Sequence, residues 1–163
     1  MKAGQIVEVG APKQLYLKPE KIFTAKFLGE ADFITGDVEE AMDTDIVVDV
    51  NGSKLRARNR AEDPLKVGEK CVLAIRPEFA LLTKKPDGLN TWKCEVAGAS
   101  FVGDTIRYDV HAENGTTLLV KSPATSFEAG YESGDEAYVT FPEENLLTYR
   151  LPEEGLEKAL SLE

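Results

Sequence analysis

The chain has 163 residues and a formal net charge of -10, from 29 acidic and 19 basic side chains. Hydrophobic residues make up 42% of it, which is typical of a globular chain rather than a disordered one. An acidic surface repels phosphate backbones and so disfavours general nucleic-acid binding. No stretch of the sequence is apolar for long enough to cross a bilayer as a helix.

Residues 11–28 have a helical pattern that is interrupted once. Pro12 suits a first helical turn, and Lys18-Pro19 breaks the run before a second helix begins. Gly29 stands where this second helix should end. At the other end of the chain, residues 152–160 have an amphipathic helical pattern.

From residue 31 onwards the pattern is that of short β-strands. Asn51-Gly52 and Asn114-Gly115 are turn signals between strand-like runs, and the turn at residues 86–88 is the best internal boundary. The expected strands cover residues 46–50, 54–58, 71–75, 92–101, 105–110, 117–121, 137–141 and 146–149. The run at 71–75 is apolar throughout, which predicts that both of its faces are covered.

The two strand series carry similar short motifs in the same order, which indicates an internal repeat. The matched pairs are residues 27–30 with 101–104, 52–55 with 115–118, 68–70 with 134–136, and 77–83 with 142–148. Each half holds about five strands, the number found in an OB-like barrel. The sequence therefore predicts a mainly β fold with two tandem OB-like halves, residues 29–86 and 87–150, that cover each other's open edges. A C-terminal helix or tail follows at 151–163.

The two cysteines, Cys71 and Cys94, each stand in a strand-like run. They are either a disulfide or metal pair, or two small apolar side chains on buried strand faces. The second interpretation is favoured because the sequence has no CxxC motif and one histidine, His111. It indicates a reducing, cytoplasmic setting.

The sequence shows no catalytic constellation. It has no GxxxxGK[ST] phosphate-binding loop, and His111 is expected to be a solvent-facing residue at a strand end. The acidic runs at residues 37–40 and 143–144 lack the spacing of a calcium loop and are expected to be solvated surface. We therefore expect no catalytic residue, no metal ligand and no cofactor-binding residue in this chain.

Two groups of residues are candidates for functional contacts. Arg76 and Glu78 directly follow the apolar strand, and Pro77 between them ends the strand ladder. Arg76 either pairs with a carboxylate inside the chain or reaches an interface or ligand with its rigid fork. Glu30 and Asp104 follow glycines at matched positions of the repeat, where they are either turn residues or line the seam between the halves.

Several of these motifs resemble the C-terminal part of the ATPase subunits of bacterial and archaeal ABC importers. They are MKAGQI, GAP, LY, FLGE and IRPE at residues 1–6, 10–12, 15–16, 27–30 and 75–78, followed by FVGD at 101–104 and PE at 142–143. In that family a helical segment leads from the nucleotide-binding domain into the TOBE domain, an OB-type double barrel. The resemblance covers nearly the whole chain.

The resemblance implies that residues 1–28 are the end of an ATPase domain and a helical linker, and that ATP and Mg²⁺ bind in that absent domain. It implies a regulatory role, in which the domain joins two ATPase subunits as a homodimer and in some members senses a small molecule. The permease subunits would be partners of the full-length protein at the cytoplasmic face of the cell membrane. The stretch GEADF at 29–33 is most similar to the branch with iron(III), polyamine and thiamine importers.

A dimer of such domains should be two-fold and self-complementary, with aromatic or arginine anchors at its centre. The candidate anchors are Phe33, Arg76, Phe101 and Tyr108. Two alternatives remain. One is an OB-type domain that senses an oxyanion, a metal or a transported solute. The other is an oligonucleotide binder, which would need a basic, aromatic groove that this sequence, with its few clustered bases, does not indicate.

Overall fold

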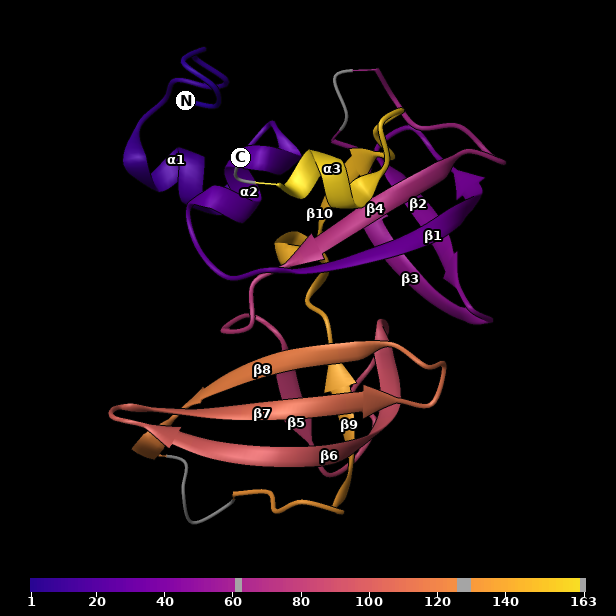
Figure 1. Ribbon diagram of the computed structural model, residues 1–163. Coiled ribbons are helices and arrows are strands. Elements are labelled where there is room, and N and C mark those ends of the chain that lie inside the picture. Colours follow the sequence, from indigo (N-terminus) through magenta and orange to yellow (C-terminus); the bar gives the residue numbers. More distant parts are fainter. Residues whose placement is uncertain (61–62, 126–129, 162–163) are drawn as a thin grey trace.

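The computed structural model of the chain describes residues 1–60, 63–125 and 130–161, so residues 162–163 of the predicted C-terminal segment lie outside it. Within these ranges the fold is mainly β, as predicted, with two five-stranded antiparallel sheets (Figure 1). The strands are β1 (Asp32–Ala41), β2 (Asp45–Val50), β3 (Ser53–Arg58), β4 (Lys70–Ile75), β5 (Leu81–Thr83), β6 (Thr91–Val102), β7 (Thr105–Ala112), β8 (Thr117–Pro123), β9 (Glu136–Thr140) and β10 (Leu147–Arg150). The helices are α1 (Pro12–Leu17), α2 (Ile22–Phe27) and α3 (Leu156–Leu160), with a 3₁₀ turn, η2 (Glu143–Asn145). None of the described helices is both long and apolar enough to cross a membrane.

Each sheet takes one strand from the other half of the chain. The strand order is β10-β4-β1-β2-β3 in the first sheet and β5-β9-β6-β7-β8 in the second. Strand β5 thus leaves the first series to pair with β9, and β10 leaves the second series to pair with β4. The turn expected as a boundary, residues 86–88, lies in the loop between β5 and β6. The exchanged strands cover edges of β4 and β9 that would otherwise present unpaired backbone groups.

Two matching β-bulges set the register of the internal repeat. The bulge in β1 follows Val38, and the bulge in β6 follows Val96. The Val38 N–H donates to the Glu69 carbonyl at 2.9 Å, and the Val96 N–H donates to the Asp135 carbonyl, also at 2.9 Å. Residue 38 therefore corresponds to residue 96.

This register corrects one of the matched motif pairs. Residues 27–30 precede β1, whereas residues 101–104 end β6 and turn into β7. In the register of the bulges, residues 27–30 correspond to 85–88, in the loop before β6. The predicted match between residues 27–30 and 101–104 is therefore wrong, because the two segments do not occupy equivalent positions of the repeat. The other three matched pairs do occupy equivalent turns or strand ends in the two halves.

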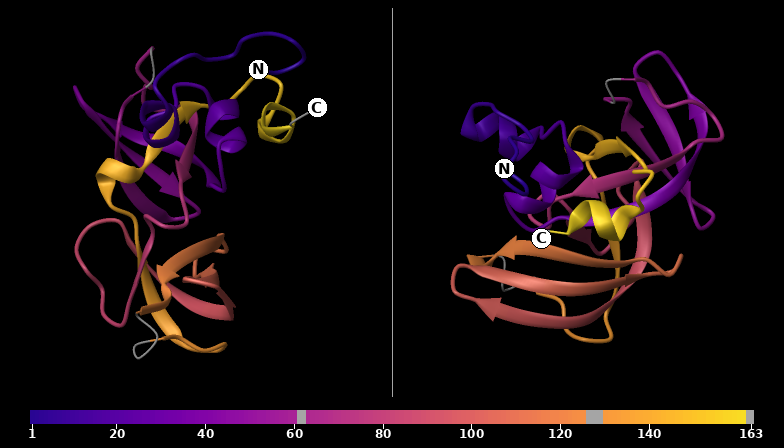
Figure 2. Two further views of the ribbon diagram at one scale, coloured as in Figure 1. Left: turned by 90° about the vertical axis from the view of Figure 1, so that its left-hand side faces the viewer. Right: turned by 45° about the horizontal axis from the view of Figure 1, so that its top comes forward.

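The main core is one cluster of buried residues from both sheets, and a smaller core lies under the helices. In β4, Cys71, Leu73 and Ile75 face the main core, while Val72 and Ala74 face the smaller core, which includes residues of α2 and α3. The ribbon views in Figure 2 show these helices packed beside the first sheet. This confirms the prediction that both faces of the apolar strand are covered, and it explains why residues 71–75 lack the usual polar alternation.

Burial should make both cysteines unreactive in the native state. The thiols are free and buried, Cys71 in β4 and Cys94 in β6. Burial raises the pKa of Cys71 to about 12 and that of Cys94 to about 11, so almost no thiolate is present at neutral pH. We expect neither thiol to react with Ellman's reagent before the chain unfolds and both to react in concentrated urea. Fast modification of the folded chain would contradict this prediction.

Candidate functional site at the junction of the helices and the sheets

Arg76 lies at the end of β4 and is 2% exposed. Its Nε and Nη2 donate to the Tyr16 carbonyl at 3.1 and 3.0 Å. Its Nη1 donates to the carbonyls of Ala25 at 3.4 Å and Glu30 at 3.2 Å. The guanidinium carbon also lies 3.8 Å from the centroid of the Tyr16 ring, in cation–π geometry. One side chain therefore holds α1, α2 and the segment before β1 against the end of β4.

These acceptors explain why an arginine can be buried here. Tyr16 and Ala25 belong to the last turns of α1 and α2, where the carbonyls have no partner within the helix. The backbone dipoles make such an end partly negative, which favours a cation. Within the described residues no carboxylate lies within salt-bridge distance of Arg76, so it does not form the internal ion pair that was one alternative. It is also too buried to reach an interface or ligand, the other alternative, and its partners are backbone carbonyls.

Glu78 and Gly29 complete the surroundings of Arg76. The Tyr16 hydroxyl donates a hydrogen bond to Glu78 Oε1. Burial, and then this hydrogen bond, raise the pKa of Tyr16. A Cβ atom at Gly29 would lie 3.1 Å from Arg76 Nη1, and the φ of +154° is one that side chains rarely adopt. Glycine at this position therefore leaves room for the guanidinium.

Glu30 connects this cluster to the second sheet. Its Oε1 lies 3.1 Å from Arg107 Nη1 on β7, and its Oε2 contacts Lys121 Nζ on β8. The hydrogen bond from Lys121, more than any other contact, lowers the pKa of the Glu30 carboxyl. The structure thus places Glu30 at the seam between the segment before β1 and the second sheet.

A cleft, here called the junction cleft, opens beside these contacts. It is lined by Tyr16, Leu28, Gly29, Glu30, Glu78, Asp104, Thr105, Lys121, Ser122 and Pro123. Asp104 reaches it from the turn between β6 and β7, so Glu30 and Asp104 face the same cleft although they are not equivalent in the repeat. The structure therefore brings together four of the seven candidates, Arg76 at the base of the cluster and Glu30, Glu78 and Asp104 around the cleft.

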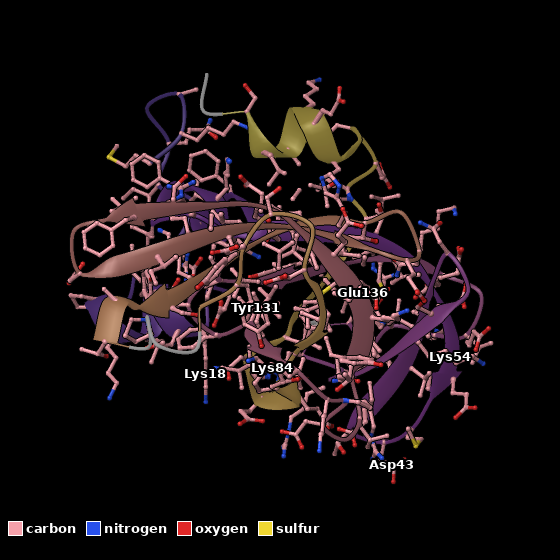
Figure 3. The ribbon with its side chains drawn as sticks, turned by 90° about the horizontal axis from the view of Figure 1, so that it is seen from below. Lys18, Asp43, Lys54, Lys84, Tyr131 and Glu136 are labelled. Atoms are coloured by element: carbon pink, nitrogen blue, oxygen red, sulfur yellow. The ribbon has the colours of Figure 1, made fainter. Side chains whose placement is uncertain are left out.

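The other three candidates lie elsewhere. Phe33 is half-buried and packs against the smaller core. Tyr108 is buried, with its ring edge-on to that of Tyr131 at 5.8 Å between centroids, and Tyr131 lies near the centre of the view in Figure 3. Phe101, at the end of β6, is 66% exposed. Of the aromatic candidates, Phe101 is the one that is largely exposed.

Two polar residues at the seam were missed by the sequence analysis. Asn90 Oδ1 accepts the Arg56 N–H at 2.7 Å, while Asn90 Nδ2 donates to the carbonyls of Arg56 at 2.7 Å and Phe141 at 3.1 Å. Asp32 Oδ2 accepts the Leu119 N–H at 3.0 Å. Each side chain belongs to one sheet and binds a strand of the other. Their correspondence could not be seen without the correct register of the repeat.

The contacts at the junction position the helices and the two sheets relative to one another. Among the residues that the structure describes, no three or more potential metal ligands are grouped. The carboxylates around the cleft are engaged with Lys121, Arg107, Tyr16 or, for Asp104, the Thr105 hydroxyl at 3.0 Å. His111, the single histidine, is exposed on β7, away from the lining of the cleft. The contacts connect three parts of the chain without assembling a nucleophile and a base.

Comparison with known proteins places this architecture in a family. The TOBE-domain family model matches residues 73–148, from β4 to β10. The Fe(3+) ions import ATP-binding protein FbpC 1 of Haemophilus influenzae is 31% identical over 127 residues, covering 78% of this chain and 36% of that protein. The spermidine/putrescine import ATP-binding protein PotA of Marinobacter nauticus is 32% identical over 120 residues, covering 73% and 32%. The chain spans about a third of the length of the curated relatives it matches, in their C-terminal region.

A solved structure shares the fold. The cytoplasmic molybdate-binding protein ModG, with molybdate bound, superposes with a TM-score of 0.62 at 18% sequence identity. The match covers 74% of this chain and 96% of the ModG chain. At this identity the likeness shows the fold alone, and it confirms the predicted OB-like architecture.

Proposed function

We propose, because this chain belongs to the TOBE-domain family of ABC importer ATP-binding subunits, that it is the non-catalytic regulatory domain of such a subunit. The observation that carries this proposal is the match to the C-terminal region of FbpC and PotA proteins, combined with a TOBE domain over residues 73–148. In the full subunit, ATP and Mg²⁺ would bind in the ATPase domain. The names of these relatives make iron(III) or a polyamine the proposed solute.

The proposed partners are the ATPase domain, the permease subunits and a second copy of this domain. A two-fold contact needs an exposed apolar centre, and Phe101 and Val102 at the end of β6 are 66% and 53% exposed. Because the chain has a net charge of -10 and Asp104 is exposed in the same turn, Asp104 must lie at the rim of such a contact. The tip of the β6–β7 hairpin is therefore the proposed centre of the dimer.

Sedimentation velocity tests the dimer directly. We expect the chain to pass reversibly from monomer to dimer between micromolar and millimolar concentration, and Phe101→Ser to shift this transition at least tenfold higher, by about 1.4 kcal/mol. Val67→Ser is the matched control, because Val67 is 62% exposed in another loop and should leave the transition unchanged. A strict monomer at all concentrations would contradict the dimer. Phosphate release from ATP and Mg²⁺ by this chain would contradict the regulatory assignment.

The alternative of a ligand-sensing domain has less support. An oxyanion site needs basic groups or free backbone N–H groups, whereas the junction cleft is lined by three carboxylates, Glu30, Glu78 and Asp104, against one lysine, Lys121. The lining of the junction cleft therefore does not support an oxyanion site there.

A further inference from the structure

The register of the repeat identifies two equivalent contacts across the seam. Strand pairing runs through Val38, Val48 and Leu55 in the first sheet and through Val96, Val110 and Leu118 in the second. The next residues along β3 and β8, Arg56 and Leu119, therefore occupy equivalent positions on the edge strands of the two sheets. By the same register, Asp32 at the start of β1 corresponds to Asn90 directly before β6.

Asn90 clamps the edge strand β3 with both ends of its amide. Its Oδ1 accepts the Arg56 N–H and its Nδ2 donates to the Arg56 carbonyl, both at 2.7 Å. The side chain thereby satisfies both outward-facing backbone groups of one residue, as a neighbouring strand would. Asn90 is 8% exposed, so these bonds replace contacts with water.

Asp32 occupies the equivalent place against β8 but has different hydrogen-bonding capacity. Its Oδ2 accepts the Leu119 N–H at 3.0 Å. In an antiparallel strand the carbonyl of a residue points to the same side as its N–H, so the Leu119 carbonyl lies on the side of β8 from which Asp32 approaches. An ionised carboxylate has no proton to donate to that carbonyl, whereas a carboxylic acid has one.

We propose that Asp32 is a proton-operated clamp between the first sheet and the edge of the second. When protonated, its O–H donates to the Leu119 carbonyl while its other oxygen keeps the Leu119 N–H, which is the two-bond arrangement that Asn90 makes at all pH values. When ionised, Asp32 keeps only the hydrogen bond from the Leu119 N–H, and its negative charge is unfavourable beside the Leu119 carbonyl oxygen. The contact between the start of β1 and the edge strand β8 is therefore stronger in mild acid than at neutral pH.

The charged side chains around Asp32 support its role as a proton-operated clamp. They are Glu30 on the same segment, Lys121 on β8, Arg107 and Asp109 on β7, and Arg76 at the end of β4. Lys121 and Arg107 are ion-paired with Glu30, and Arg76 binds carbonyls. Burial first, and then the charge of Glu30, raise the pKa of Asp32 to about 6, against the lowering effect of the Leu119 N–H.

The direction of the pH effect follows from this shift. A carboxyl whose pKa is higher in the folded chain than its ordinary 3.8 binds its proton more tightly when folded. The protonated Asp32 carboxyl therefore stabilises the folded chain. This stabilisation is fully present below 3.8, the pKa of the carboxyl in the unfolded chain, and is lost as the pH rises through about 6. Between about pH 5 and pH 8, Asp32 should raise the unfolding equilibrium constant by about tenfold.

Two reciprocal substitutions test the clamp, with unfolding in urea measured from about pH 5 to 8. Relative to the native chain, Asp32→Asn should remove this tenfold change, because its amide can make both bonds without a proton. Asn90→Asp should introduce a new pH dependence of the same sign. Equal pH dependence of the native chain and Asp32→Asn would overturn the proposal.

A spectroscopic measurement on the unmodified chain does not depend on variant stability. The ¹³C carboxyl resonance of Asp32 should titrate near pH 6. The protection of the Leu119 amide, which is its exchange rate relative to that of the unfolded chain at the same pH, should be greater below that pH than above it. Titration near the ordinary value of about 4 would overturn the proposal.

Discussion

Replacing Arg76 with methionine should destabilise the folded chain by roughly 3 kcal/mol, because three backbone carbonyls lose their donors at once when the buried guanidinium is removed. The carbonyls belong to Tyr16, Ala25 and Glu30, and all three accept from the one guanidinium. Methionine keeps much of the volume of the side chain, so the loss reports the hydrogen bonds rather than a cavity. Urea unfolding with linear extrapolation measures the change in the free energy of unfolding.

Two further variants separate this role from a general effect of charge. Arg76→Lys should recover only part of the loss, since one ammonium group cannot reproduce the planar fork that reaches three carbonyls. Arg58→Met is the matched control, because Arg58 is exposed and its removal should change stability by less than about 0.5 kcal/mol. Similar small losses for Arg76→Met and Arg58→Met would show that Arg76 is not the residue that holds the helices.

The contacts of Arg76 and Glu30 couple the helices to both sheets, which bears on the proposed regulatory role. The helical segment is fixed to the first sheet through Arg76 and to the second sheet through Glu30. A displacement of α1 or α2 would therefore be passed to both sheets. Limited proteolysis should find the segment around residues 12–27 protected in the native chain and cleaved first in Arg76→Met.

Most of the individual elements could be predicted from the sequence because their signals are local. The turn at Asn51-Gly52 and the apolar run at residues 71–75 each depend on neighbouring residues, and both lie where they were expected. The repeat was also visible, but a likeness over four residues, 27–30 with 101–104, set part of its register wrongly. Short glycine turns recur too often in β proteins for such a match to fix an alignment.

The contacts of the junction could not be predicted because their partners are distant in sequence. Nothing near Arg76 indicates that its acceptors lie at Tyr16 and Ala25, in a segment that packs against β4 only after the fold has formed. The exchange of β5 and β10 is equally hidden, since pairing between strands leaves no mark on the strands themselves. For the same reason, the equivalence of Asp32 and Asn90 emerged only from the bulges and the pairing register.

Substituting Gly36 with alanine should destabilise the chain by about 3 kcal/mol, because β1 lies so close to its neighbour β2 at this residue that a side chain has no room. A Cβ atom there would lie 2.5 Å from Val48 Cγ1 and 2.6 Å from the Asp49 backbone oxygen. A methyl group of valine can rotate away, but a backbone oxygen inside a sheet cannot move without disturbing the pairing of β1 with β2. The φ of Gly36 lies outside the left-handed region, so the cost comes from this overlap and not from backbone strain.

Gly98→Ala is the matched control for this effect. Gly98 also lies within a strand and also has no positive φ, but the nearest atom to a Cβ there is Asp109 Oδ2 at 3.5 Å, an ordinary contact with a flexible side chain. This substitution should be neutral or stabilise the chain by up to about 1 kcal/mol, since alanine restricts the unfolded chain more than glycine does. Thermal and urea unfolding of both variants measure the difference. If Gly36→Ala were as stable as Gly98→Ala, the close approach of β1 to β2 at Gly36 would be wrong.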